Sequence, residues 1–301
     1  MHPHTHVATL ICAPLQSALT PQLLDRAAAV LPEAGEPVWL DAGIAADLTF
    51  TAETGFDCRS AADAIRAALG EAPVDAAVQP LAHRRKKLFL ADMDSTIIGQ
   101  ECIDELADVV GVKAHVAAIT ERAMRGEIEF EPALRERVAL LKGLPAGMVD
   151  QVVAERLTLN PGARTLVQTL RANSVHTMLV SGGFTLFTGK IAAMTGFHEN
   201  RANTLIIEED AFAGRVQEPI LGKQAKLDAL IEARARLAID PADTMAVGDG
   251  ANDLAMLGEA GLGFAYHAKP AVAAAAHVRI DHADLTALLY VQGYRKQDFR
   301  D

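Results

Sequence analysis

Three polar segments of the chain carry side chains that could together transfer a phosphoryl group. Each segment follows a short apolar run and contains acidic, hydroxyl or glycine residues. In doubly wound parallel sheets, ligands bind beyond the carboxyl ends of the strands, so we expect the three segments to meet at one sheet edge. The segments are Asp92-Met93-Asp94-Ser95-Thr96, Ser181-Gly182-Gly183 and Gly248-Asp249-Gly250-Ala251-Asn252-Asp253.

The aspartates of these segments predict a site for a hard metal ion. Four carboxylates at one sheet edge repel one another, which is costly unless a cation neutralises them or one of them is protonated. No histidine or cysteine stands at ligand spacing, so an oxygen-preferring cation is indicated. Mg²⁺ suits this set because it takes a few carboxylates, keeps waters and accepts phosphate oxygens. The predicted ligands are Asp92, Asp94, Asp249 and Asp253.

Phosphoryl transfer also needs a nucleophile, an acid for the leaving group and donors for the phosphate oxygens. Asp92 is predicted to attack phosphorus and form an aspartyl-phosphate. Asp94 is predicted to protonate the leaving alkoxide and then to activate water against the acyl phosphate. The Ser181 hydroxyl and the N–H groups of Gly182 and Gly183 are predicted to bind phosphate oxygens, since glycine lets the backbone approach closely.

A lysine ahead of the third segment would supply fixed positive charge, and Lys223 and Lys226 are both candidates by position. Each segment also has a plainer interpretation. Asp-x-Asp and Ser-Gly-Gly alone are more often turns, and the third segment resembles a calcium loop that lacks the glutamate expected at the twelfth loop position. Their occurrence in this order on alternating strands favours the catalytic interpretation.

The elements that must position these residues form an α/β pattern. Leu88–Ala91 is continuously apolar, as expected of a parallel strand covered on both faces. Further strands alternate with helical patterns, which predicts a doubly wound parallel sheet. A long helical insert at about 100–160 follows the first strand, and a β-hairpin is expected within 202–216. The other predicted strands are 177–180, 244–247 and 261–265, with helices at 185–195, 223–237 and 252–259.

Residues 1–83 predict a separate, smaller α+β domain before the phosphoryl-transfer domain at 84–301. Its strands and helices follow the order βαββαβ, which is that of a ferredoxin-like domain. Thr20 and Ser60 are the predicted N-caps of its two helices. It contains no catalytic constellation, so a regulatory or structural role is expected. The basic run 83–87 is interpreted as a solvated linker. The predicted strands are 7–13, 38–40, 47–50 and 74–78, with helices at 21–31 and 61–69.

The composition excludes some classes of partner. The 301 residues carry 28 basic and 39 acidic side chains, a formal net charge of −11, which disfavours nucleic acid and anionic membranes as partners. No apolar stretch is long enough to span a bilayer. The three cysteines form no pair or cluster at metal-ligand spacing and predict free thiols in a reducing, cytoplasmic environment. A homodimer is a further expectation.

With these motifs, the chain resembles the haloacid dehalogenase superfamily of aspartate-nucleophile phosphatases. The resemblance runs from about Leu88 to the C-terminus and covers four family motifs. It implies Asp92 as nucleophile, Asp94 as general acid/base and Ser181 as a phosphate ligand. The spacing of 23 residues to Asp249 matches Lys226, and not Lys223, to the family lysine. It further implies Asp249 as a metal ligand, Asp253 as a support of the metal shell, and Asn252 as a residue facing the substrate.

Within the superfamily the chain looks most like the phosphoserine phosphatases, which catalyse the last step of serine biosynthesis. This resemblance implies that the insert is a cap over the site. Glu101, nine residues after the nucleophile, would bind the substrate ammonium, and Arg137 would bind its carboxylate. Met124 and Phe130 match apolar cap positions that exclude water. The expected substrate is therefore O-phospho-L-serine.

Two other functions stay open on the sequence. The first is a phosphotransferase or a phosphatase of another small phosphomonoester. The second is an amino-acid-sensing protein with a relic catalytic domain, which the intact set of aspartates disfavours. The N-terminal domain resembles, more loosely, the ACT type of amino-acid-binding regulatory domain, and this implies feedback by serine.

Overall fold

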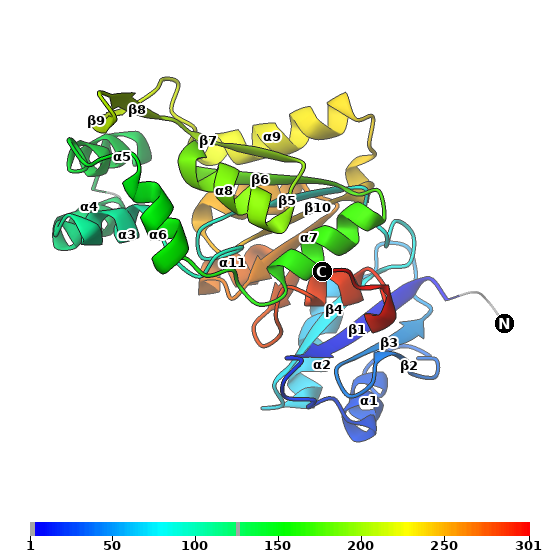
Figure 1. Ribbon diagram of the computed structural model, residues 1–301. Helices are drawn as coiled ribbons and strands as arrows, with labels where there is room; N and C mark the ends of the chain where they lie inside the picture. Colours follow the sequence, from blue (N-terminus) through cyan, green and yellow to red (C-terminus); the bar gives the residue numbers. More distant parts are fainter. Residues whose placement is uncertain (1–3, 125–126) are drawn as a thin grey trace.

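The computed structural model describes residues 4–124 and 127–301 and contains, besides a two-stranded hairpin, two larger sheets that belong to two successive parts of the chain (Figure 1). The first sheet is antiparallel, has the strand order β2-β3-β1-β4, and is completed by two helices. This is the predicted ferredoxin-like arrangement. Its elements are β1 (His6–Cys12), α1 (Pro21–Ala28), β2 (Val38–Asp41), β3 (Ala45–Phe50), α2 (Cys58–Leu69) and β4 (Val74–Pro80).

The helix caps of this N-terminal part follow local sequence chemistry. The Thr20 side chain accepts a hydrogen bond from the Leu23 N–H and begins α1, as predicted. The prediction for α2 was wrong: the N-cap is Asp57, whose carboxylate accepts from the N–H groups of Arg59 and Ser60. Both Asp and Ser are good N-caps, so the sequence pattern alone did not separate them.

The second sheet is fully parallel, with the strand order β12-β11-β10-β5-β6-β7. From the central β5 the chain proceeds to β6 and β7 on one side and to β10, β11 and β12 on the other. The strand order reverses beside β5, and a doubly wound sheet opens a crevice at such a point. The strands are β5 (Leu88–Ala91), β6 (His176–Phe184), β7 (Glu199–Asn203), β10 (Thr244–Gly248), β11 (Leu262–Tyr266) and β12 (Val278–Ile280).

Helices cover both faces of this sheet. Phe89 and Ala91 pack in one buried apolar cluster with α7 and α8, whereas Leu88 and Leu90 pack in another with α9, α10 and α11. Alternate residues of a strand point to opposite faces, so a strand buried on both is apolar throughout. The helices are α7 (Ala163–Ala172), α8 (Thr185–Thr195), α9 (Lys223–Arg236), α10 (Leu254–Glu259), α11 (Pro270–Ala275) and α12 (Ala287–Val291).

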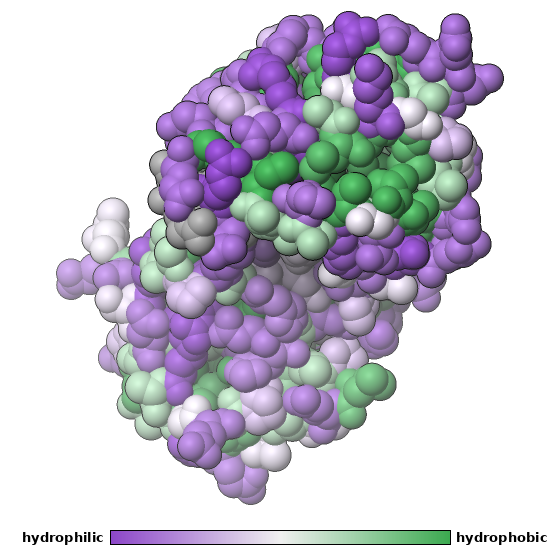
Figure 2. Space-filling view, turned by 90° about the vertical axis from the view of Figure 1, so that its left-hand side faces the viewer, coloured by the Kyte–Doolittle hydropathy of each residue, from purple (hydrophilic) through white to green (hydrophobic). Residues whose placement is uncertain are grey.

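The predicted helical insert after β5 forms a cap, drawn at the left of Figure 1. The predicted hairpin packs against it, since the N–H of Gly143 donates to the carbonyl of Phe212 at 2.9 Å. Figure 2 views this side of the molecule and shows apolar surface on the upper half and a hollow beneath it. The elements are α3 (Cys102–Val109), α4 (Lys113–Met124), α5 (Phe130–Ala139), α6 (Met148–Glu155), β8 (Leu205–Glu208) and β9 (Ala211–Val216).

The basic run 83–87 is a solvated linker only in part: His83, Arg85 and Lys87 are exposed, whereas Arg84 is half-buried and Lys86 is buried. Arg84 pairs with Asp47 of β3 at 2.8 Å and donates to the carbonyl of Val291 in α12 at 2.9 Å. Lys86 is only 6% exposed, and its ammonium donates to a backbone carbonyl ahead of β10. The acceptors come from distant parts of the chain, so the local charge pattern could not reveal them. The run joins the two parts of the protein. Within the described residues, no helix is long and apolar enough to cross a membrane.

Candidate active site

The carboxylate of Asp92 lies at the centre of the site, directly after β5. Its strand is held between β10 and β6, and the Asp92 N–H donates to the carbonyl of Val247 at 3.0 Å. Oδ1 accepts the N–H of Met93 at 2.8 Å and lies 2.7 Å from Nζ of Lys226. The residue is 5% exposed. The sheet therefore buries an acid at its carboxyl edge and pairs it with one lysine.

Lys226, on the first turns of α9, joins Asp92 to a second buried acid. Its Nζ lies 2.7 Å from Oδ1 of Asp253, and neither side chain is more than 2% exposed. Oδ2 of Asp253 accepts the N–H of Gly250 at 3.0 Å. A Cβ at Gly248 would lie 2.3 Å from Cγ of Asp253, so a residue with a side chain there would displace this acid. By contrast, Lys223 is exposed.

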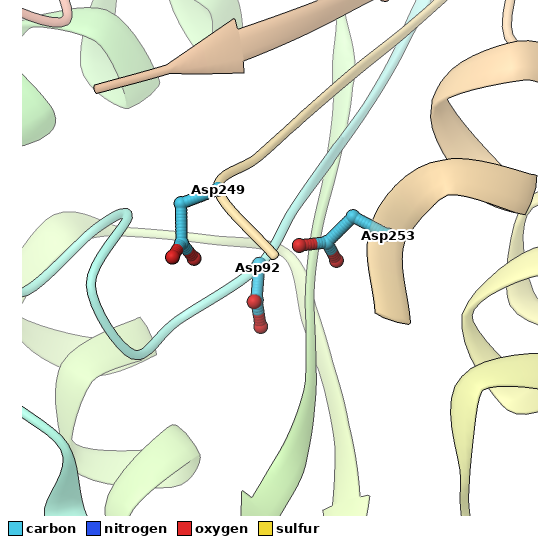
Figure 3. A group of neighbouring side chains, drawn as sticks. All are labelled: Asp92, Asp249 and Asp253. Carbon is cyan, nitrogen blue, oxygen red and sulfur yellow. The ribbon is translucent and has the colours of Figure 1, made fainter. Parts of the chain in front are cut away.

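Three carboxylates converge on one point and could hold a metal ion. Oxygen atoms of Asp92, Asp249 and Asp253 lie within 4.8 Å of one another, and Figure 3 shows Asp92 approaching from one segment and the two other acids from another. Asp249 is partly exposed, and one of its oxygens accepts the Thr96 hydroxyl at 3.3 Å. An all-oxygen set of this kind suits a hard divalent cation. Among the described residues, the predicted ligand Asp94 does not belong to this group.

Asp94 has different partners. Its Oδ1 accepts the N–H of Cys102 at the start of α3 at 2.9 Å, and its Oδ2 accepts the Ser181 hydroxyl at 3.2 Å. The Ser181 oxygen in turn accepts the N–H of Gly183 at 2.8 Å. Two of the predicted segments thus meet through hydrogen bonds. The position of Asp94 beside the segment predicted to bind phosphate suits proton transfer better than metal ligation.

Burial disfavours the ionised form of Asp92, Asp94 and Asp249. Burial raises the pKa of Asp92 well above its usual value, and Asp253 raises it further, while Lys226 opposes both effects. Burial likewise raises the pKa of Asp94 and, together with Asp253, that of Asp249. Burial alone would lower the pKa of Lys226, but its two carboxylate partners outweigh burial and raise it. A bound cation would lower the pKa values of these carboxyl groups and favour their ionised form.

The cap places a carboxylate and a guanidinium above the sheet edge. Glu101 directly precedes α3, and its Oε1 accepts the Ser95 hydroxyl at 2.7 Å. Protein atoms around the carboxyl group and the nearby Asp94 raise the pKa of Glu101 to about 7. The residue taken as a whole is exposed. Arg137 of α5 is half-buried, and burial lowers its pKa while Asp104 and Glu101 oppose this. The two predicted recognition groups therefore share one electrostatic environment.

The remaining predicted residues differ in how the structure places them. The ring of Phe130, 37% exposed, lies over Gly182. Asn252 is exposed, in the short 3₁₀ helix Ala251–Asp253 after β10. Met124 ends α4, and its side chain lies outside the described residues.

Sequence reasoning missed three residues that contact this site. Thr96 donates to Asp249, Ser95 donates to Glu101, and Asn203 donates to the carbonyl of Gly182. Ser95 and Thr96 stand in the first predicted segment but received no role there, although a hydroxyl close to an acid pair is a plausible partner for a metal ligand. Asn203 lies outside the predicted segments and gives no comparable signal.

Known proteins resemble this chain over most of its length. A family model described as haloacid dehalogenase-like hydrolase matches residues 89–258. A phosphoserine phosphatase of Polaromonas sp. (strain JS666) is 49% identical over 208 residues, which cover 67% of this chain and 88% of that protein.

Solved structures of phosphoserine phosphatases also resemble this chain. A probable phosphoserine phosphatase from Vibrio cholerae matches with a TM-score of 0.74 and 30% identity, covering 98% of this chain and 88% of that one. A phospho-aspartyl intermediate analogue of phosphoserine phosphatase matches with a TM-score of 0.63 and 39% identity, covering 70% of this chain and all (100%) of that one.

Proposed function

The chain belongs to the haloacid dehalogenase-like hydrolase family, and we propose that it hydrolyses O-phospho-L-serine to L-serine and phosphate through an aspartyl-phosphate on Asp92. The observation that carries this proposal is the buried Asp92–Lys226–Asp253 group at the sheet edge, with Glu101 and Arg137 held by the cap. The similar phosphoserine phosphatases support the substrate, and one of them was solved as a phospho-aspartyl intermediate analogue.

In the first half-reaction, a carboxylate oxygen of Asp92 attacks phosphorus and the bond from phosphorus to the seryl oxygen breaks. Asp94 gives its proton to the departing seryl oxygen. The raised pKa of Asp94 favours the protonated form that this step needs. The Ser181 hydroxyl and the N–H groups that follow it bind phosphate oxygens, and Lys226 offsets the negative charge that Asp92 carries before it attacks.

In the second half-reaction, Asp94 takes a proton from water as the water attacks the aspartyl-phosphate. Phosphate leaves and Asp92 is restored. A single carboxyl group can serve both steps because the first step leaves it ionised, ready to act as a base. The hydrogen bond from the Cys102 N–H keeps it in one position throughout, while the single O–H of Ser181, which donates to Asp94 in the free protein, turns to a phosphate oxygen when substrate binds.

The donor set suits Mg²⁺. Asp92 and Asp249 would hold the ion, since Asp249 has one long hydrogen bond from Thr96, whereas both oxygens of Asp253 are engaged by Lys226 and Gly250. When bound, the ion would neutralise charge on the phosphate and polarise it. Asp253 then acts by holding the lysine in place.

The cap supplies recognition of the amino acid. Glu101 would accept the substrate ammonium, and the planar fork of Arg137 would bind the carboxylate. Phe130 and Met124 would exclude water from the reacting groups. The roles of these cap residues, the cytoplasmic location, a homodimer and amino-acid binding by the N-terminal domain all stay predictions.

The test is phosphate release by the purified protein with Mg²⁺ on a panel of small phosphomonoesters, with and without hydroxyl acceptors and EDTA. We expect O-phospho-L-serine to have the highest kcat/KM and EDTA to abolish turnover. The Asp92→Asn variant should be inactive. Preference for an ester without an amino-acid group would refute the substrate, and wild-type turnover by Asp92→Asn would refute the mechanism.

A further inference from the structure

The side chain of Asn203 joins two loops that surround the phosphate site. It stands at the end of β7 and is 2% exposed. Nδ2 donates to the carbonyls of Gly182 at 2.9 Å and Leu221 at 3.1 Å, and Oδ1 accepts the N–H of Leu221 at 2.7 Å. The first, residues 181–183, lies near the end of β6 where the pairing with β7 is interrupted; it binds phosphate in the proposed reaction and is called the phosphate loop. The other loop leads into α9, which carries Lys226.

Only an amide suits this position well. The Asn203 amide uses two N–H hydrogens as donors and its oxygen as an acceptor. A carboxylate at this position would place oxygen against two carbonyl oxygens and has no hydrogen to donate. An apolar side chain would leave buried backbone groups without partners, which is costly. Asn203 therefore fixes the distance between the phosphate loop and the start of α9.

Phe130 of the cap rests on both of these loops. A Cβ at Gly182 would lie 3.5 Å from Cζ of the Phe130 ring, and a Cβ at Gly222 would lie 3.5 Å from its Cδ1. These are ordinary van der Waals distances, so the ring lies directly over two glycines that are 40 residues apart in sequence. We call Gly182 and Gly222 the glycine seat. Asn203 binds the carbonyl of Gly182 and the backbone of Leu221, which directly precedes Gly222.

We propose that Asn203 is a positioning residue that holds the glycine seat in shape, so that Phe130 can settle on it and the cap can close over the phosphate. This role rests on the proposed function, because closure matters only if the cap covers a reacting phosphate. Asn203 does not touch the reacting groups. It acts through the phosphate loop on one side and through Phe130 on the other.

A double-mutant cycle between Asn203→Ala and Phe130→Ala tests the proposal, with kcat and KM measured on O-phospho-L-serine and Mg²⁺. We expect each single change to lower kcat/KM at least tenfold. The double variant should lose at least fivefold less than the product of the two single losses, because the second change removes a contact already lost. Losses that multiply within twofold would overturn the proposal.

Gln292→Ala is the matched control. Gln292 is fully buried, accepts the N–H of Lys86 and donates to the carbonyl of Leu288, but it lies away from the cap. Its loss should lower the unfolding midpoint without lowering kcat/KM and without coupling to Phe130. Coupling of equal size in this control would show that general destabilisation produces the effect, and would also overturn the proposal.

Gly222→Leu tests the seat if Asn203→Ala does not fold. Gly222 is the half-buried N-cap of α9, where a side chain is tolerated by the backbone but meets the Phe130 ring. We expect a loss of kcat/KM that Phe130→Ala does not deepen, whereas independent losses would contradict the seat. Wild-type protein that leaves phosphoserine intact would refute the proposed function instead, which separates the two failures.

Discussion

Replacement of Lys226 by methionine is the sharpest test of the electrostatics of the site. The substitution keeps an unbranched side chain but removes the positive charge between Asp92 and Asp253, which lie 2.7 Å from Nζ on either side. All three side chains are at most 7% exposed. The two carboxylates then face each other without a shared cation.

The cost follows from burial. Removal of one partner from a buried ion pair costs about 3–5 kcal/mol, because the remaining charge is left without compensation. We expect the free energy of unfolding to fall by an amount near this range. In catalysis, loss of one preorganised charge partner lowers kcat by about 10²–10³. We expect Lys226→Met to reach at least that loss.

The pH dependence provides a second signature. Lys226 lowers the pKa of Asp92 against the effects of burial and Asp253, so its removal raises that pKa further. The nucleophile must be ionised to attack. The acid limb of the kcat/KM profile should therefore shift to higher pH in the variant, and activity should recover partly as pH rises.

The assay is phosphate release from O-phospho-L-serine at saturating Mg²⁺, with urea unfolding on the same samples. Lys223→Met is the matched control: this lysine lies one turn earlier on α9 and is exposed. It should retain activity within about twofold, as expected for a surface change. Full activity in Lys226→Met, or a larger loss in Lys223→Met, would refute the reasoning.

Three further predictions follow from the same contacts. Asp249→Asn should raise the half-saturating Mg²⁺ concentration at least tenfold, measured by titrating phosphate release after EDTA treatment. Arg84→Ala should lower the free energy of unfolding by about 3–5 kcal/mol because it leaves the buried Asp47 carboxylate without its cation, whereas Lys87→Ala should move the urea midpoint less because Asp243 keeps its contact with His83. Because the pKa of Glu101 is raised to about 7, KM for phosphoserine should rise as pH falls from 8 to 6, when the carboxylate takes up a proton. Glu101→Gln should lack this dependence, and an unchanged slope would contradict it.

The central strands could be predicted because their signals are local. Leu88–Ala91 is apolar throughout and ends at Asp92, and the structure gives β5 these same bounds. The edge strand β7, Glu199-Asn200-Arg201-Ala202-Asn203, escaped prediction because an edge strand needs little apolar surface. The three-residue β12 is too short for any periodicity to show. Sequence patterns therefore located the middle of the sheet, where burial on both faces dictates composition, and missed its margins.

The same contrast holds in the site. Asp92 and Asp253 could be proposed because they follow strands whose ends must lie at the sheet edge. Ser181 was expected after a strand at 177–180, but β6 continues to Phe184, so Ser181 lies near the carboxyl end of the strand. The partners of Asn203 and Arg84 could not be predicted. Asn203 donates to a backbone carbonyl far away in the chain, and Arg84 binds a distant backbone carbonyl and a distant acid. A charge run such as 83–87 signals solvation only if no acceptor approaches it, and acceptors are set by tertiary packing.

The charge of the site explains why an acidic protein could bind a dianionic phosphate. Asp92, Asp249 and Asp253, when ionised, contribute three negative charges and Lys226 one positive charge, which leaves −2 before any ion binds. A bare site of this charge would repel phosphate at short range. One divalent cation brings the sum to zero, and the N–H groups of the phosphate loop then bind the substrate without opposition. A bound divalent ion would thus serve affinity as well as chemistry, so its removal should weaken the binding of inorganic phosphate, which is not consumed, to the wild-type protein. Equal phosphate affinity with Mg²⁺ and with EDTA, measured by calorimetry, would refute this account.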